Sequence, residues 1–177
     1  MQARRINDEV YVADERIVRV TRHHIERLRE LAADTPRRRV RLCAHKDSRD
    51  ALHEMLIVLD SATYIQPHRH RNKSESFHVI DGLLSVVVFT DDGRIEDVIR
   101  LGDYASGRTF FYRLADAAYH TVLLESERAV FHETTNGPFR REETEFAPWA
   151  PAEADAAAAR QFLDQLTQEV NGFRPAA

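Results

Sequence analysis

The most informative segment of the chain is Pro67-His68-Arg69-His70-Arg71-Asn72-Lys73-Ser74-Glu75, which is followed by Gly82. Residues two apart on a β-strand point to the same side, so His68 and His70 can present both imidazoles to one point. The four residues that follow His70 can turn the chain, which lets Glu75 open the next strand facing back. Two imidazoles and a carboxylate form a ligand set that suits Fe, Mn, Ni, Cu or Zn. The segment therefore predicts a metal site built on two neighbouring strands.

A fourth ligand would have to come from a distant strand, and His120 is the candidate because it lies within the apolar run Ala118–Leu124. The chain has nine histidines in 177 residues, and the seven at positions 45 to 132 fall in its middle part. Histidine is the commonest metal ligand in proteins. We therefore expect one divalent ion (Fe, Mn, Ni or Zn) to be held by His68, His70, Glu75 and His120.

The sequence around this segment has the two-residue period of β-strands. Val40, Leu42 and Ala44 alternate with Arg41, Cys43 and His45, and eight further strand-like runs follow, separated by turn residues such as Asp91-Asp92-Gly93. These runs are His53–Asp60, Tyr64–His70, Ser76–Ile80, Leu84–Thr90, Ile95–Leu101, Thr109–Leu114, His120–Glu125 and Ala129–Thr134. Many short strands without intervening helices indicate a sandwich or barrel.

Helical periodicity is confined to the two ends of the chain. Thr21 is a candidate N-cap for a helix over about 22–34, and a second amphipathic helix is expected over about 153–170. We therefore expect an N-terminal extension over residues 1–37, an all-β core over 38–135 and a C-terminal extension over 136–177. Both helices should pack outside the barrel.

Composition narrows the classes of partner. The chain has 25 basic and 29 acidic residues, which gives no reason to expect a nucleic-acid partner. The longest aliphatic stretches have the length of strands and cannot span a bilayer, and the single cysteine excludes a disulfide within the chain. We expect a cytoplasmic protein with no membrane contact. Exposed sheet edges and terminal extensions favour a homodimer.

The metal-ligand residues resemble the cupin superfamily. His68, His70, Glu75 and Gly82 match the first cupin motif, although Ala62 stands where that motif begins with glycine. Of the second motif, Gly107 and His120 match, whereas Ala115, Ala117 and Leu124 replace its proline, second glycine and asparagine. The resemblance implies a cupin jelly-roll barrel with one metal site.

A likeness to the WbuC-type cupin metalloproteins extends over most of the chain. It is carried by Arg39–His45, Leu52–Met55, Lys73–Ile80, His132–Phe139 and Ala147–Pro151. That family is associated with bacterial surface-polysaccharide (O-antigen) gene clusters, and its reaction is undefined. The resemblance implies chemistry on a sugar or another small molecule without naming the substrate.

Six further residues are candidates for the pocket or the substrate. Arg41, Cys43 and His45 share one strand face, which either lines the metal pocket or forms an outer surface. His132 could line the pocket mouth, Tyr112 could contact a substrate hydroxyl or serve in packing, and Lys73 could attract an anionic substrate or be a solvated turn residue.

Two functions of different classes fit these residues. Three histidines and one glutamate leave up to two open positions on a six-coordinate ion, which allows a metalloenzyme that catalyses isomerisation or dioxygenation. A non-catalytic metal- or ligand-binding module, such as a sensor or pathway partner, is the alternative, since no acid or base group is evident. A metal-free cupin that isomerises sugars through histidine and tyrosine is a third option.

Overall fold

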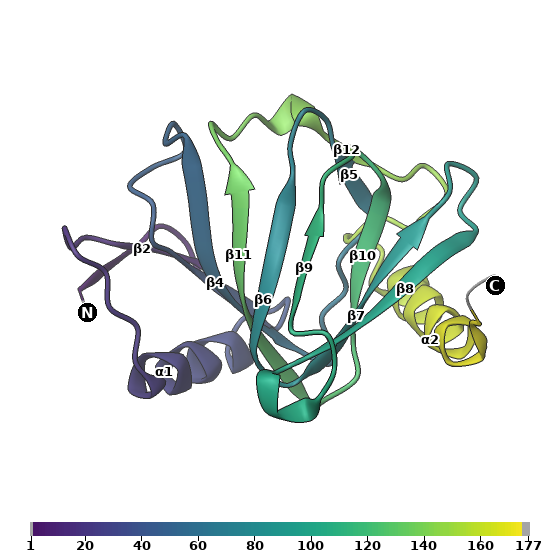
Figure 1. Cartoon of the computed structure of the whole chain (residues 1–177), viewed down its shortest axis with the longest axis horizontal. Coiled ribbons are helices and arrows are strands. Elements are labelled where there is room, and N and C mark those ends of the chain that lie inside the picture. Colours follow the sequence, from purple (N-terminus) through teal and green to yellow (C-terminus); the bar gives the residue numbers. More distant parts are fainter. Residues whose placement is uncertain (1, 175–177) are drawn as a thin grey trace.

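The computed structural model describes residues 2–174, which form two β-sheets and two α-helices (Figure 1). The larger sheet, sheet A, has the strand order β1-β2-β3-β4-β11-β6-β9, and the smaller one, sheet B, has the order β12-β5-β10-β7-β8. Neighbouring strands are antiparallel except for the parallel pair β2–β3. The strands of sheet A are β1 (Ala3–Arg5), β2 (Val10–Ala13), β3 (Arg39–Cys43), β4 (Leu52–Asp60), β6 (Glu75–Asp81), β9 (Phe111–Leu114) and β11 (Arg128–Asn136). Those of sheet B are β5 (His68–His70), β7 (Leu83–Phe89), β8 (Ile95–Gly102), β10 (Tyr119–Leu124) and β12 (Thr144–Phe146).

The main hydrophobic core lies between the two sheets. Phe77, Val79 and Phe131 of sheet A meet Val86, Leu101 and Val122 of sheet B in one buried cluster. Alternate residues of each strand point into this layer, because the side-chain period of a strand is two. The jelly-roll fold predicted from the sequence is confirmed.

Strand β7 is apolar on both faces because α2 (Ala156–Gly172) covers the outer side of sheet B. In β7, Val86 and Val88 face the core between the sheets, while Val87 and Phe89 pack with Leu166 and Val170. These last two residues belong to α2. A strand buried on both faces reads as a continuous apolar run, which is why Val86–Phe89 does not alternate.

Helix α1 (Arg22–Ala33) covers the outer face of sheet A. Its Ile25, Leu28 and Ala32 pack against Val40 and Leu42 of β3, together with residues of β4 and β11. Thr21 is its N-cap, as the sequence predicted, and the Thr21 amide donates a hydrogen bond to His24 Nδ1. Figure 1 shows the two helices on opposite sides of the sheets. Neither helix has the length and apolar character needed to cross a bilayer.

The sheets also include strands outside the stretch that the sequence indicated as the core. β1 and β2 extend sheet A from the N-terminal side, and β12 pairs with β5 from the C-terminal side. The strand expected over Tyr64–His70 forms only over His68–His70. Pro67 lacks an amide proton and cannot donate to a strand ladder, which is consistent with the late start of this strand. Two short 3₁₀ helices, Tyr104–Ser106 and Arg141–Glu143, lie in the connections.

Phe131 provides a test of the core between the sheets. Its side chain is 1% exposed, and its ring lies 4.5 Å from that of Phe77. We expect Phe131→Ala to lower the free energy of unfolding by about 3–5 kcal/mol, because the cavity that it leaves cannot close fully. Urea unfolding of the metal-free protein measures this change. The control Phe111→Ala, at a residue that is 51% exposed, should change it by less than about 1 kcal/mol. Equal losses in the two variants would contradict the assignment of the core.

Candidate metal centre

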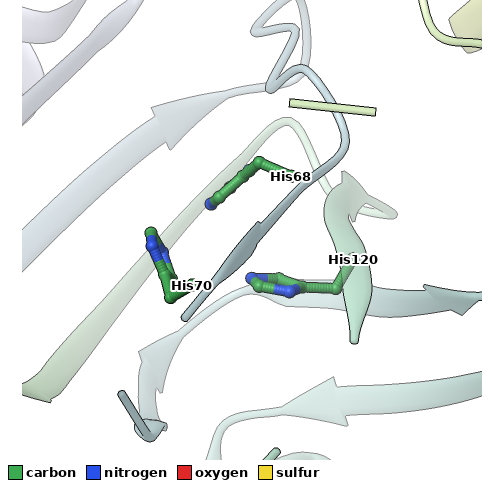
Figure 2. A group of neighbouring side chains, drawn as sticks. All are labelled: His68, His70 and His120. Carbon is green, nitrogen blue, oxygen red and sulfur yellow. The ribbon is translucent and has the colours of Figure 1, made fainter. Parts of the chain in front are cut away.

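Three imidazoles converge in the space between the sheets (Figure 2). His68 and His70 are on β5, and His120 is on β10, where it pairs directly with His68. One ring nitrogen of each residue lies within 4.8 Å of the corresponding nitrogens of the other two. The structure therefore brings together the three histidines that the sequence singled out.

Each imidazole is oriented by a hydrogen bond at its Nδ1 atom. His68 Nδ1 lies 2.9 Å from the carbonyl oxygen of Gln66, and His120 Nδ1 lies 2.9 Å from that of Ala118. His70 Nδ1 lies 3.2 Å from Thr144 Oγ1. A carbonyl oxygen can only accept, so Nδ1 of His68 and of His120 carries the proton and donates it. This leaves Nε2 as the atom with which each of these two rings, once neutral, can bind a metal, which is the usual arrangement at a metal site.

Glu75 lies at the edge of this cluster. Its Oε1 is 3.0 Å from His120 Nε2, and its Oε2 is 3.7 Å from His70 Nε2. The carboxylate is buried and also accepts a 2.7 Å hydrogen bond from the Tyr112 hydroxyl. Glu75 is thus within reach of the ring nitrogens that would share a metal with it, and Tyr112 fixes one of its oxygens.

The charges of this cluster compensate one another. Burial alone would raise the pKa of Glu75, but His120 and Tyr112 together outweigh it and lower that pKa. The pKa of His120 is raised, because the Glu75 charge and hydrogen bond outweigh the effect of burial. Burial lowers the pKa of His70, and it lowers the pKa of His68 to about 3 with help from the charges of its two histidine neighbours. Without metal, the cluster therefore favours an ionised Glu75 beside a proton on His120 and neutral rings at His68 and His70.

Two segments outside the motif hold the ligand strands in place. Asn136 Oδ1 accepts hydrogen bonds from the amide and the hydroxyl of Ser74, which fixes the turn before Glu75. In β12, Glu145 binds Arg69 and Arg71 on either side of His70, with separations of 2.9 Å to both guanidinium groups. Sequence reasoning missed the role of Thr144 and Glu145, since a three-residue strand after an irregular stretch has no periodic signal.

Arg41 and Cys43 lie on the inner face of sheet A. Their neighbours Val40 and Leu42 point the other way, toward α1. Cys43 is buried with Val12 and Met55, and burial raises the pKa of its thiol. Arg41 is exposed, with Nη1 4.0 Å from the sulfur of Met55.

His45 lies in the connection between β3 and β4. Its ring stacks on that of His53 at 4.1 Å, and its Nδ1 lies 3.1 Å from the carbonyl oxygen of Glu54. Of the three residues predicted to share one strand face, Arg41 and Cys43 point into the space between the sheets. His45 instead packs on the buried His53, and it belongs to no metal-ligand cluster among residues 2–174.

Two other candidates have partners that constrain their roles. The Tyr112 hydroxyl is engaged by Glu75, so it touches a candidate ligand. Lys73 Nζ lies 3.5 Å from Glu143 and donates to the carbonyl oxygen of Pro138, and its side chain is only 8% exposed. Lys73 is therefore a paired, buried cation rather than a solvated turn residue.

His132 does not line the space between the sheets. It pairs with Leu56 and His78 on the outer face of sheet A, and its Nε2 lies 3.8 Å from Glu54 Oε1. The expectation that it lines the pocket mouth is therefore corrected. Its inward-facing neighbours on β11 are Phe131 and Glu133, because alternate residues of a strand point to opposite faces.

Comparison with known proteins gives one match to a family model. Residues 20–101 match a model described as "Domain of unknown function (DUF6016)". This range contains His68, His70 and Glu75 but not His120. No curated protein matches the chain.

Solved structures resemble this chain at low sequence identity. Protein SO0799 from Shewanella oneidensis has a TM-score of 0.50 and 17% identity, over 75% of this chain and 81% of that one. A variant of the oxalate decarboxylase of B. subtilis has a TM-score of 0.45 and 18% identity, over 66% of this chain and 31% of that one. The Schizosaccharomyces pombe Cnp3 cupin domain has a TM-score of 0.43 and 10% identity, over 55% and 64%. Such identities bear on the fold alone. With two facing, mostly antiparallel sheets around a common core, this chain has a jelly-roll fold.

Proposed function

We propose that this protein is a cupin metalloprotein that binds one divalent transition metal ion through His68, His70, His120 and Glu75. The observation that carries the proposal is the convergence of three ring nitrogens within 4.8 Å of one another. The chemical type of these ligands fits such an ion, because imidazole and carboxylate groups bind Fe, Mn, Ni and Zn alike.

The surroundings of the three rings support a metal site over a structural cluster. A histidine that serves only in packing needs no particular tautomer. Here the protein fixes Nδ1 of each ring from outside and leaves Nε2 directed inward, which lowers the cost of ordering the ligands when an ion binds. The Glu75 carboxylate brings a negative charge that offsets part of the charge of a divalent ion.

We further propose that the protein is a metalloenzyme that acts on a small molecule. A bound divalent ion would supply Lewis-acid chemistry at the coordination positions that the four side chains leave open. The chain's own part is to orient the four ligands and to place polar groups beside them. Isomerisation and dioxygenation remain the two candidate reactions. A sugar of surface-polysaccharide metabolism is the proposed substrate class, on the likeness to WbuC-type proteins.

The alternative is a non-catalytic module that binds the same metal or a ligand. Polar side chains beside the cluster, Tyr112 and Glu133, favour chemistry over simple storage of an ion. Turnover of a candidate sugar by the metal-loaded protein, lost in His120→Ala, distinguishes the enzyme from the module.

Elemental analysis tests the ligand set. Protein purified without added metal, then saturated with Zn²⁺ and desalted, should hold about one ion per chain. In His68→Ala and His120→Ala the content after desalting should fall several-fold, because each variant removes one imidazole from the ligand set and weakens the binding of the ion. The matched control is His78→Ala, at an exposed histidine on the outer face of sheet A, which should bind as the unaltered protein does. Equal metal content in all variants, with circular dichroism showing intact folds, would refute the site.

Tyr112→Phe tests how Glu75 is held. Loss of the 2.7 Å hydrogen bond frees the carboxylate and should weaken Zn²⁺ binding by about 10–100-fold while leaving the saturating stoichiometry unchanged. The control Tyr104→Phe, at a residue that is 80% exposed, should leave the affinity unaltered. Competition with a chromogenic chelator measures both affinities. No change in Tyr112→Phe would show that Glu75 is positioned without this hydroxyl.

The pH dependence of metal affinity follows from His120. Its raised pKa means that the metal-free protein keeps a proton on this residue up to a higher pH than an ordinary histidine does, and an incoming ion must displace that proton. Affinity should therefore weaken as the pH falls below the pKa of His120, by about tenfold per pH unit for each proton displaced. Chelator competition between pH 6 and pH 8 checks this slope, and an affinity that stays constant over that range would contradict the expectation.

A further inference from the structure

Glu133 is a carboxyl on the inner face of β11 that the proposed ligand set does not use. It follows Phe131 by two residues, so both side chains point into the space between the sheets. Its cross-strand partners are Met55 on β4 and Phe77 on β6, and both of these are buried. The carboxyl is thus half-buried among apolar side chains that offer it no hydrogen-bond donor.

The strand register fixes where Glu133 lies relative to the metal centre. Thr135, two residues further along β11, is the direct partner of Glu75. Glu133 is therefore the diagonal neighbour of Glu75 on the same face, and such pairs lie about 7–8 Å apart, with their Cβ atoms somewhat closer. Glu133 is not part of the group of ligand atoms that gather within 4.8 Å of one another among residues 2–174, but it lies within the reach of a small molecule or one water bound there.

Several charged and titratable groups face Glu133 from the surrounding strands. Glu75 opposes its ionisation, whereas Arg41 and His120 favour it. Burial, together with the Glu75 charge, raises the pKa of Glu133 to about 8. The negative charge of an ionised Glu133 would in turn raise the pKa values of Cys43, Tyr112 and His120. On β4 the inward histidine is His53, whose own pKa is lowered by burial.

We propose that Glu133 is the proton-transfer group of the metal centre. It holds a proton in the metal-free protein, releases it when a divalent ion binds, and then accepts a proton from a hydroxyl group or water held beside the four ligands. In that transfer the O–H bond of the hydroxyl breaks, its electron pair stays on that oxygen, and a new O–H bond forms on a carboxylate oxygen of Glu133. No oxidant or reductant is required. This inference rests on the proposed metal site.

The physical reason for the release is the change in charge at the centre. Without metal, the ionised Glu75 faces Glu133, and a second negative charge in a poorly solvated space is unfavourable. A divalent ion reverses the sign of the local field and favours the carboxylate form of Glu133. Arg41, on the same face of sheet A, supports that form from the other side. Binding of the ion thereby converts an acid into a base.

Proton counting with Zn²⁺ alone tests the inference without any substrate. Calorimetric titration at pH 7 in buffers of different ionisation enthalpy gives the number of protons released for each ion bound. We expect Glu133→Gln to bind one ion per chain and to release about one proton fewer than the unaltered protein. The matched control is Glu54→Gln, whose residue lies on the neighbouring strand β4 and on the outer face beside His132. It should release the same number of protons as the unaltered protein.

The outcomes separate this inference from the proposed function. If Zn²⁺ fails to bind the unaltered protein, the metal site itself fails. If Zn²⁺ binds, but Glu133→Gln and the unaltered protein release equal numbers of protons, only the role of Glu133 is overturned. Infrared difference spectra of the unaltered protein, labelled with ¹³C-glutamate, provide a second measurement that needs no variant. A protonated carboxyl band should be present at pH 7 without metal and disappear with Zn²⁺, and its persistence would refute the role.

Discussion

The antiparallel pairing of β5 with β10 is the constraint on which the site depends, because it sets His68 directly opposite His120. β5 has only three residues, so few ladder hydrogen bonds hold it in this register. β12 pairs along its other edge and places Thr144 beside His70 and Phe146 beside His68. A segment from beyond the barrel thus completes the sheet beside the three imidazoles.

Electrostatic compensation explains how a carboxylate can be buried at this point. An isolated carboxylate in such a place would be costly, and the protein would neutralise it. Glu75 avoids this cost by accepting a hydrogen bond from Tyr112 and facing the His120 ring at 3.0 Å. Glu133, one step along the same face, has no such partners and takes the opposite state. Two carboxyls on neighbouring strands thus differ in protonation because their surroundings differ, which is a common basis for assigning acid and base roles.

The helices pack outside the two sheets, so the space between the sheets holds both the main hydrophobic core and this cluster. α1 and α2 bury the outer faces of sheets A and B, so the apolar surface needed for stability does not have to come from the inner face alone. Outside the cluster, Glu145 holds Arg69 and Arg71, and Asn136 holds the turn at Ser74. The rigidity of the ligand strands comes from these contacts on their outer side.

Local sequence patterns were enough to predict a β-sandwich or barrel, the places of both helices and the three histidines that meet. Each of these is encoded in local periodicity: the period of two in the strands, helical spacing at the two ends, and the His-x-His pair that puts two rings on one side of a strand. Only the folded chain shows that His132 faces outward, that Tyr112 serves Glu75, that Thr144 orients His70 and that Glu133 lies beside the centre. These facts depend on strand register and on contacts between residues far apart in the chain, and a one-residue change of register would reverse the face of every side chain on a strand.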